Sequence, residues 1–152
     1  MVYLTRRYRF SASHRLHSEA LTAEENARTY GSCNNPYGHG HNYTLDVTVA
    51  GDVDPSTGMV IDLGLLDRVV QENILDRLDH THLNLDVDIF RALVPTTENV
   101  CAEIYKLLSI KLTFSKGGAR LTKIRLEETS SNYFEYEAPG GNVMSRDEDM
   151  GD

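Results

Sequence analysis

The sequence predicts an α+β fold in which an antiparallel four-stranded sheet carries a pair of helices on one face. Segments with alternating apolar and polar residues lie near both ends of the chain, and two segments with apolar residues at helical spacing lie between them. Strands grouped before and after a helix pair are typical of this architecture, because the sheet and the helices each bury one apolar face against the other.

The N-terminal part of the chain has the pattern of strands. Apolar residues alternate with polar ones from Tyr3 to Ser13 and again from Asn42 to Gly51. Residues 17–38 are polar and rich in turn residues, so we expect a long excursion there, with a helical turn near TAEENA. The turn residues of DVDPSTGMVID predict a hairpin that leads to a third short strand.

Two helices follow. Asp62 is a good N-cap, and the apolar spacing behind it predicts an amphipathic helix from residue 63 to about residue 77. A second helix begins after PTTEN, where Thr96 or Thr97 can cap and Glu98 complements the positive helix end. The connection between the helices, LDHTHLNLDVDIF, is dense in ionisable groups.

The chain then returns to strand, from Leu121 to about Glu128 and from Tyr133 to Glu137. We therefore predict one domain over residues 1–140 and an acidic, disordered tail over residues 141–152. Because an open sheet has unpaired edges that favour pairing with another copy, a homo-oligomer is expected.

Composition narrows the classes of function. The chain has 152 residues, of which 40% are hydrophobic and 25% charged, and no apolar run approaches the roughly 20 residues of a membrane helix. The first residues lack the pattern of a secretory signal, so we expect a cytoplasmic protein. The net charge of −8 argues against nucleic acid as a partner, although local basic groups can still bind an anionic substrate.

The two cysteines, Cys33 and Cys101, give no disulfide framework. Cys101 stands beside Val100 and Ile104 in the second helix, and we expect it to be a core residue. Cys33 lies in the excursion, six residues before His39, where a reactive or metal-linked thiol is plausible.

Three histidines form a candidate zinc site. His39 and His41 are separated by one residue, so in a strand both imidazoles project from one face. His14 ends the first strand and could meet them if the two strands adjoin, with His17 as the substitute. Zinc prefers imidazole and thiolate ligands. Cys33 either completes a closed structural site or stays beside an open position as a reacting thiolate, and spacing alone does not choose.

Two acidic positions are further candidates. Asp79 directly precedes His80, and the two could orient a thiolate base if the helix end there gives an irregular backbone; otherwise they only end a helix. Glu128 falls on the same face of its predicted strand as Ile124 and Leu126, which is the apolar face. A carboxylate there either marks the end of the strand or meets a ligand that offers hydrogen-bond donors. Thr96, Thr97 and Glu98 are capping residues that could also bind an anion.

Six segments taken together resemble the 6-pyruvoyl tetrahydropterin synthase family: RFSASHRL, CNNPYGHGHNY, DPSTGMVID, LDHTHLNLD, TTENV and EETSSN. The resemblance spans roughly residues 3–137 in order. It implies a tunnelling fold (T-fold), a homohexamer of two stacked trimers, and active sites at the subunit interfaces.

The resemblance also implies roles for the candidate residues. His14, His39 and His41 would bind zinc, Cys33 would be the base, and a neighbouring subunit would supply Asp79 and His80 as its relay. Glu128 would anchor the pterin ring, with Thr96, Thr97 and Glu98 on a second segment that contacts the ring. The loop LTFSKGGARL looks longer than is usual in the family, so the anchor could be Glu127 instead.

The implied reaction converts 7,8-dihydroneopterin triphosphate to 6-pyruvoyl-tetrahydropterin and inorganic triphosphate, in tetrahydrobiopterin biosynthesis. Zinc would act as a Lewis acid, and magnesium would accompany the triphosphate. The runner-up is the related 6-carboxy-tetrahydropterin synthase, which typically has three residues between its cysteine and the first histidine, where this chain has the five of NNPYG. A non-catalytic zinc-binding or pterin-binding module is the alternative outside enzymes.

Overall fold

The computed structural model describes residues 1–112 and 118–137 of the chain. Its sheet has the order β3-β1-β2-β4-β5. The four long strands pair with one another in antiparallel fashion, as predicted, and have these bounds: β1 Val2–His14, β2 His39–Gly51, β4 Arg120–Thr129 and β5 Asn132–Glu137. A fifth strand of two residues, β3 Thr81–His82, pairs in parallel with the end of β1.

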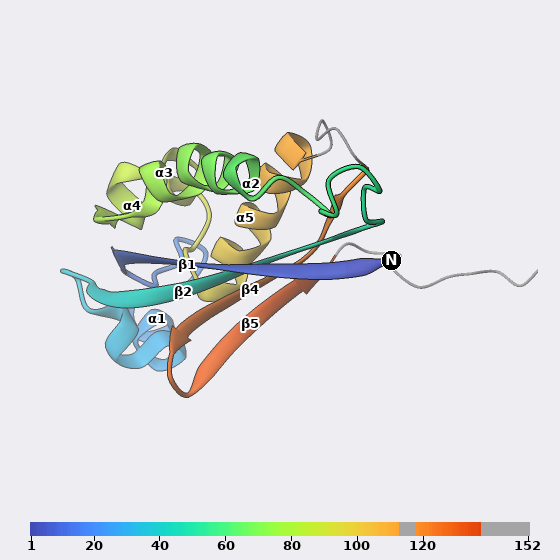
Figure 1. Cartoon of the computed structure of the whole chain (residues 1–152). Helices are drawn as coiled ribbons and strands as arrows, with labels where there is room; N and C mark the ends of the chain where they lie inside the picture. The colour runs from blue at the N-terminus through green and yellow to red at the C-terminus, as the bar shows by residue number, and fades with distance from the viewer. Residues whose placement is uncertain (113–117, 138–152) are drawn as a thin grey trace, which may run out of the picture.

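Most of the helical segments gather on one side of this sheet, while α1 lies apart from them near the start of β2 (Figure 1). The long helix α5 packs across β4 and β5, and α2 packs against α5. The helical segments are α1 Ala23–Tyr30, η1 Gly31–Asn34, α2 Leu63–Val70, η2 Gln71–Leu75, α3 Asp76–Leu78, α4 Leu83–Asp86, η3 Asp88–Arg91 and α5 Thr97–Leu112. The predicted α+β class with a helix-covered antiparallel sheet is therefore confirmed, and the short β3 is an addition to it.

The segment between β1 and β2 contains more helix than a single turn. Thr22 and Glu25 form a capping box at the start of α1: the Thr22 hydroxyl accepts from the Glu25 amide, and the Glu25 carboxylate accepts from the Thr22 amide. Gly31, at φ 55°, ends the helix and lets the chain turn into η1. The amide of Leu16 donates to the carbonyl of Cys33 (2.8 Å), which holds η1 against the end of β1.

The third short strand, predicted to follow the turn residues of DVDPSTGMVID, does not form. That segment forms a turn in which Gly58 donates to the carbonyl of Asp54 (2.7 Å), and the chain then enters α2 without pairing. The reason lies in the sheet order, since β2 already has β1 on one side and β4 on the other. No edge of β2 remains for a hairpin partner.

The first predicted helix is one continuous stretch of α2, η2 and α3, with a π-helical turn at η2. Its predicted N-cap, Asp62, accepts from the amide of Gly64 (2.8 Å). At the second predicted helix, the Thr96 hydroxyl accepts from the amide of Asn99 (3.2 Å), so Thr96 rather than Thr97 caps α5.

The core lies between the helices and the inner face of the sheet. Leu45, Val47, Ile124 and Leu126 from the central strands are fully buried there, together with apolar residues of α2 and α5. Cys101 is 1% exposed among them, which confirms its prediction as a core residue. Within residues 1–112 and 118–137, no helix has the length and apolar character needed to cross a membrane.

The tail at residues 141–152 lies outside the described residues, and so do residues 113–117 of the loop LTFSKGGARL. The described strands nevertheless fix where the candidate site forms. The C-terminal end of β1 and the N-terminal end of β2 pair directly at one end of the sheet.

Candidate metal and catalytic site

Three imidazoles meet where β1 and β2 pair. In the antiparallel register His14 lies opposite His39, and Ala12 lies opposite His41. One donor atom from each of the three rings lies within 4.8 Å of the others, and the Nε2 atoms of His14 and His39 are 3.2 Å apart. Two nitrogens bound tetrahedrally to one zinc ion would be about 3.3 Å apart. The cluster therefore fits one ion of this kind, and it is the three-histidine set predicted from the sequence.

The second nitrogen of His14 is already oriented. Its Nδ1 lies 2.8 Å from the carbonyl oxygen of Pro95, and the residue is completely buried. A carbonyl can only accept, so Nδ1 carries the hydrogen and Nε2 presents its lone pair to the cluster. A backbone oxygen thus selects the tautomer that a metal needs.

His41 has an unsatisfied atom inside the cluster. Its Nε2 is buried and has no hydrogen-bond partner in the part of the chain that the structure describes. Burial lowers the pKa of both His41 and His14, which favours the neutral imidazoles that bind metals. A buried nitrogen that lacks a partner is costly, and a metal ion would satisfy it.

Cys33 and His17 are not part of the three-imidazole cluster. Among the described residues, the set of donor atoms close enough to share an ion contains the three imidazoles alone. Cys33 is not in a disulfide and is partly buried on η1. His17, the substitute ligand, instead contacts Asn34 through Nδ1 (3.0 Å). This geometry favours the reading in which Cys33 is not a metal ligand.

Asp79 and His80 have the irregular backbone that their contact requires. Asp79 ends α3 in an extended conformation, and His80 follows at φ 59°, a left-handed conformation that is uncommon for a side-chain-bearing residue. As a result His80 Nδ1 lies 2.9 Å from an Asp79 carboxylate oxygen. Neighbouring residues on a regular helix could not make this contact.

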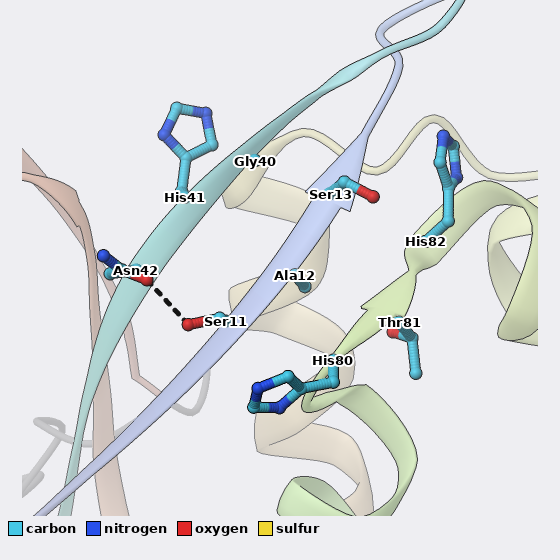
Figure 2. A pocket seen from close by; sticks show the side chains of 9 residues that line it. All are labelled: Ser11, Ala12, Ser13, Gly40, His41, Asn42, His80, Thr81 and His82. Carbon is cyan, nitrogen blue, oxygen red and sulfur yellow. Dashed lines mark hydrogen bonds between the residues drawn. The ribbon is translucent and has the colours of Figure 1, made fainter.

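The backbone of Ser11 holds the pair against β1. Its amide donates to Asp79 (2.8 Å), and its carbonyl accepts from the amide of His80 (2.6 Å). The hydrogen bond from Ser11 is the main reason that the pKa of Asp79 is lowered, so the carboxylate stays ionised. Figure 2 shows the His80 ring beside Ser11 and separated from the His41 ring on β2.

Glu128, and not Glu127, faces the imidazoles. A Glu128 carboxylate oxygen lies 3.4 Å from His41 Nε2 and 3.8 Å from His14 Nε2. Glu127 lies instead near Arg125 (3.9 Å), a residue that is hydrogen-bonded to Asp46. The register between β4 and β5 shifts at this point. Because such an irregularity can change which side of a strand a residue faces, the alternating pattern alone does not distinguish Glu127 from Glu128.

The three residues of the other predicted contact segment, Thr96, Thr97 and Glu98, have different environments. Thr96 is occupied as the N-cap of α5, and Glu98 is exposed to solvent. Thr97 is 3% exposed and turns inward. The structure therefore brings Thr97 toward the site, beside Tyr43, and leaves Glu98 exposed at the first turn of α5.

Tyr43 is a residue of the site that the sequence analysis did not single out. It is 1% exposed, and its ring stands against that of His41 with centroids 5.7 Å apart. Its hydroxyl lies beside that of Thr97, and neither has another hydrogen-bond partner among residues 1–112 and 118–137. The sequence did contain a signal for it: Tyr43 follows His41 by two residues in one strand, so the two side chains project from the same face.

Comparisons with known proteins agree with this geometry. Residues 3–139 match the family described as 6-pyruvoyl tetrahydropterin synthase. A 6-pyruvoyl tetrahydrobiopterin synthase of Poecilia reticulata is 47% identical over 134 residues, covering 88% of each chain. The solved 6-pyruvoyl tetrahydropterin synthase of Caenorhabditis elegans superposes with a TM-score of 0.84 at 43% identity, over 91% of this chain and 96% of that one.

A relative with the runner-up activity also matches, at lower identity. A 6-carboxy-5,6,7,8-tetrahydropterin synthase of Bacillus subtilis is 32% identical over 108 residues, covering 69% of this chain and 71% of its own.

Proposed function

The chain belongs to the 6-pyruvoyl tetrahydropterin synthase family, and from that membership and the site geometry we infer how its own residues act. It is a lyase of tetrahydrobiopterin biosynthesis that converts 7,8-dihydroneopterin triphosphate to 6-pyruvoyl-5,6,7,8-tetrahydropterin and releases inorganic triphosphate. What remains to be proposed is the assignment of residues, metal and assembly to this reaction.

The observation that carries the proposal is the cluster of His14, His39 and His41 beside Glu128. The three imidazoles would hold one zinc ion in each subunit, with a position left for the substrate. When bound, zinc supplies Lewis-acid polarisation of the oxygens on the substrate's side chain. The Pro95 carbonyl supports this role, because it fixes the metal-binding tautomer of His14.

Cys33 is the general base that removes the substrate's side-chain protons. Its place outside the three-imidazole cluster supports this role, because a thiolate bound to zinc would not be available to take a proton. The hydrogen bond between Leu16 and the Cys33 carbonyl sets the position of the thiol relative to the end of β1.

Asp79 and His80 relay the proton for the Cys33 of a neighbouring subunit. The His80 side chain is 83% exposed in the isolated chain and stands apart from its own His41, which leaves it accessible to another copy. Asp79 holds His80 through Nδ1, so the outward Nε2 can exchange a proton. The lowered pKa of Asp79 keeps the carboxylate that orients the ring ionised.

Glu128 anchors the pterin ring. Its carboxylate faces the site at 17% exposure and accepts from Asn132 (3.1 Å), so it can also accept hydrogen bonds from the guanidine-like edge of a pterin. Thr96, Thr97 and Glu98 form the second ring-contacting segment, with Thr97 the member that points inward in this chain.

The working enzyme is a cytoplasmic homohexamer of two stacked trimers with interfacial active sites, and magnesium accompanies the triphosphate. Among the described residues, the outer edge of β5 and the part of β1 that precedes its short pairing with β3 have no strand partner, which supports assembly because exposed strand edges pair readily with another copy. Assembly would also bring the exposed His80 of one subunit to the Cys33 of another, as the proposed relay requires.

Product analysis tests the proposal. The zinc-loaded protein incubated with 7,8-dihydroneopterin triphosphate should release inorganic triphosphate and form the 6-pyruvoyl product. Release of acetaldehyde would instead indicate the 6-carboxy reaction. A protein that binds zinc and the pterin without turnover would be a binding module.

A further inference from the structure

A pocket lies just beyond the end of β1, next to the imidazole cluster. Its volume is about 580 Å³, and it opens between the segment that follows His14 and the segment that leads into α5. Pro95, whose carbonyl orients His14, is part of its wall. The pocket and the imidazole cluster therefore share a boundary.

The lining of this pocket is basic. Arg15, His17, His82 and Arg91 contribute to it, against one acidic side chain, that of Glu19. The Glu19 carboxyl is 98% exposed, so water screens most of its charge. Arg91 is also paired with Asp88 (3.2 Å), so Arg15 is the cation in the wall without a carboxylate partner among the described residues.

Arg15 is held in place at three points. Asn84 clamps its backbone, accepting from its amide and donating to its carbonyl (both 2.8 Å). The Nε of Arg15 donates to the carbonyl of Asn34 (3.1 Å), which lies next to Cys33. In the described part of the chain its two terminal nitrogens have no acceptor, and they form the planar fork that suits a phosphate group.

Two imidazoles add donors to this pocket. The side-chain amide of Asn34 donates to Leu16, and its nitrogen also lies 3.0 Å from His17 Nδ1. His17 Nδ1 therefore accepts, which leaves the hydrogen on Nε2, 3.8 Å from the exposed carboxylate of Glu19. His82 has a buried Nδ1 that lacks a partner within residues 1–112 and 118–137, an unsatisfied group at the pocket wall. Figure 2 shows His82 on β3, beside Ser13.

The sheet order separates this pocket from the proposed ring anchor. Glu128 lies on β4, the imidazoles on β2 and β1, and His82 on β3, which is the edge strand on the far side of β1. The substrate has a matching order, with the pterin ring at one end, the side-chain oxygens in the middle and the triphosphate at the other end. A ring held by Glu128 would direct the triphosphate toward Arg15.

We propose that this pocket, with Arg15 as its principal cation and His17 and His82 as further donors, binds the triphosphate of the substrate and the inorganic triphosphate that is released. The inference rests on the proposed function for the orientation of the substrate. Charge-assisted hydrogen bonds from a guanidinium to phosphate oxygens are among the strongest that a protein offers. The site thus selects a phosphorylated pterin over the unphosphorylated compound.

The direct test uses inorganic triphosphate as the probe and calorimetry on the zinc-loaded protein. Arg15→Gln should weaken triphosphate binding by about 10- to 100-fold, the range expected for charged hydrogen bonds, and should raise KM for the substrate by a similar factor. Arg15→Lys should recover part of the affinity, because it restores charge without the planar fork. A merely structural role for Arg15 would not give this graded recovery.

A matched control removes a positive charge elsewhere. Lys123 pairs with Glu135 (3.3 Å) and is not part of this pocket, so Lys123→Gln should leave triphosphate affinity unchanged. Zinc content and circular dichroism should be the same for all variants. If Arg15→Gln does not fold, His17→Gln is the second variant, with a several-fold loss of affinity expected.

The outcomes separate this inference from the proposed function. A wild-type protein that forms the pyruvoyl product, together with a folded Arg15→Gln variant that binds triphosphate normally, overturns the triphosphate site and leaves the activity standing. A wild-type protein that binds triphosphate through Arg15 but forms no product supports the site and overturns the activity. Failure of the wild-type protein to bind triphosphate also overturns the site.

Discussion

The Nδ1 atom of His14 lies 2.8 Å from the carbonyl oxygen of Pro95, so a residue 81 positions away determines which nitrogen of the ring faces the cluster. The carbonyl keeps the hydrogen on Nδ1 and leaves the Nε2 lone pair facing His39 and His41. The connection before α5 thereby prepares the end of β1 to bind a metal.

Removal of one clustered imidazole should remove the metal. His39→Ala leaves two nitrogen ligands, so we expect zinc and activity to be lost together, as measured by elemental analysis and product formation. His80→Ala is the matched variant, because it removes an imidazole that lies outside the cluster and should keep full zinc content. A metal-replete and active His39→Ala protein would remove His39 from the ligand set.

Cys33→Ala should separate metal binding from turnover. Because the thiol is not part of the imidazole cluster, the variant should retain one zinc per subunit. Loss of a general base typically lowers the rate by about 10²- to 10⁴-fold, and we expect kcat to fall within that range. Loss of zinc in this variant would show that sulfur binds the metal and would favour a closed structural site.

Glu128→Ala should weaken substrate binding without removing zinc. Its carboxylate lies near the imidazoles at 17% exposure, and loss of hydrogen bonds to a charged acceptor should raise KM by about tenfold or more. Glu127→Ala is the control, because Glu127 lies near Arg125 instead. If the Glu127 variant shows the defect and the Glu128 variant does not, the anchor has been assigned to the wrong residue.

Asp79→Asn tests the relay. An asparagine oxygen can still accept from the Ser11 amide, but it carries no charge to support a protonated His80. We expect kcat to fall by roughly 10²-fold, with zinc content and KM close to those of the wild type. An unchanged kcat would mean that Asp79 only ends α3.

Asp46→Asn should reduce stability in a pH-dependent way. The Asp46 carboxylate accepts from Arg7 (2.8 and 3.1 Å) and from Arg125 (3.2 Å), and these bonds, chiefly those from Arg7, lower its pKa. A lowered carboxyl pKa stabilises the folded state above the unfolded value of about 3.9, and this contribution is lost as pH falls through the lower folded pKa.

At pH 7 we therefore expect the variant to lower the free energy of unfolding by about 1–3 kcal/mol in urea titrations. The difference from the wild type should shrink as the pH drops below about 4. Asp52→Asn is the control, since the Asp52 carboxylate is 92% exposed and should contribute little. A difference that stays constant into acid would contradict the assigned ion pairs.

The alternating pattern in the sequence predicted the four long strands and their inward faces, because one face of each strand must be buried. It failed at the segment before Asp62, where a short apolar stretch looked like a strand. Pairing depends on which edges are vacant, and β2 has none. The two-residue β3 was equally hidden, since its pairing with β1 depends on the turn at His80.

The sequence by itself determined the residue types of the site and the shared face of His39 and His41, because strand periodicity acts between near neighbours. Tertiary structure decided that His14 faces His39 across the sheet, that Glu128 rather than Glu127 approaches the rings, and that Pro95 orients His14. It alone placed Arg15 beside the thiol segment and the cluster. These relationships join residues far apart in the chain, and only the packing of the whole sheet against its helices fixes such distances.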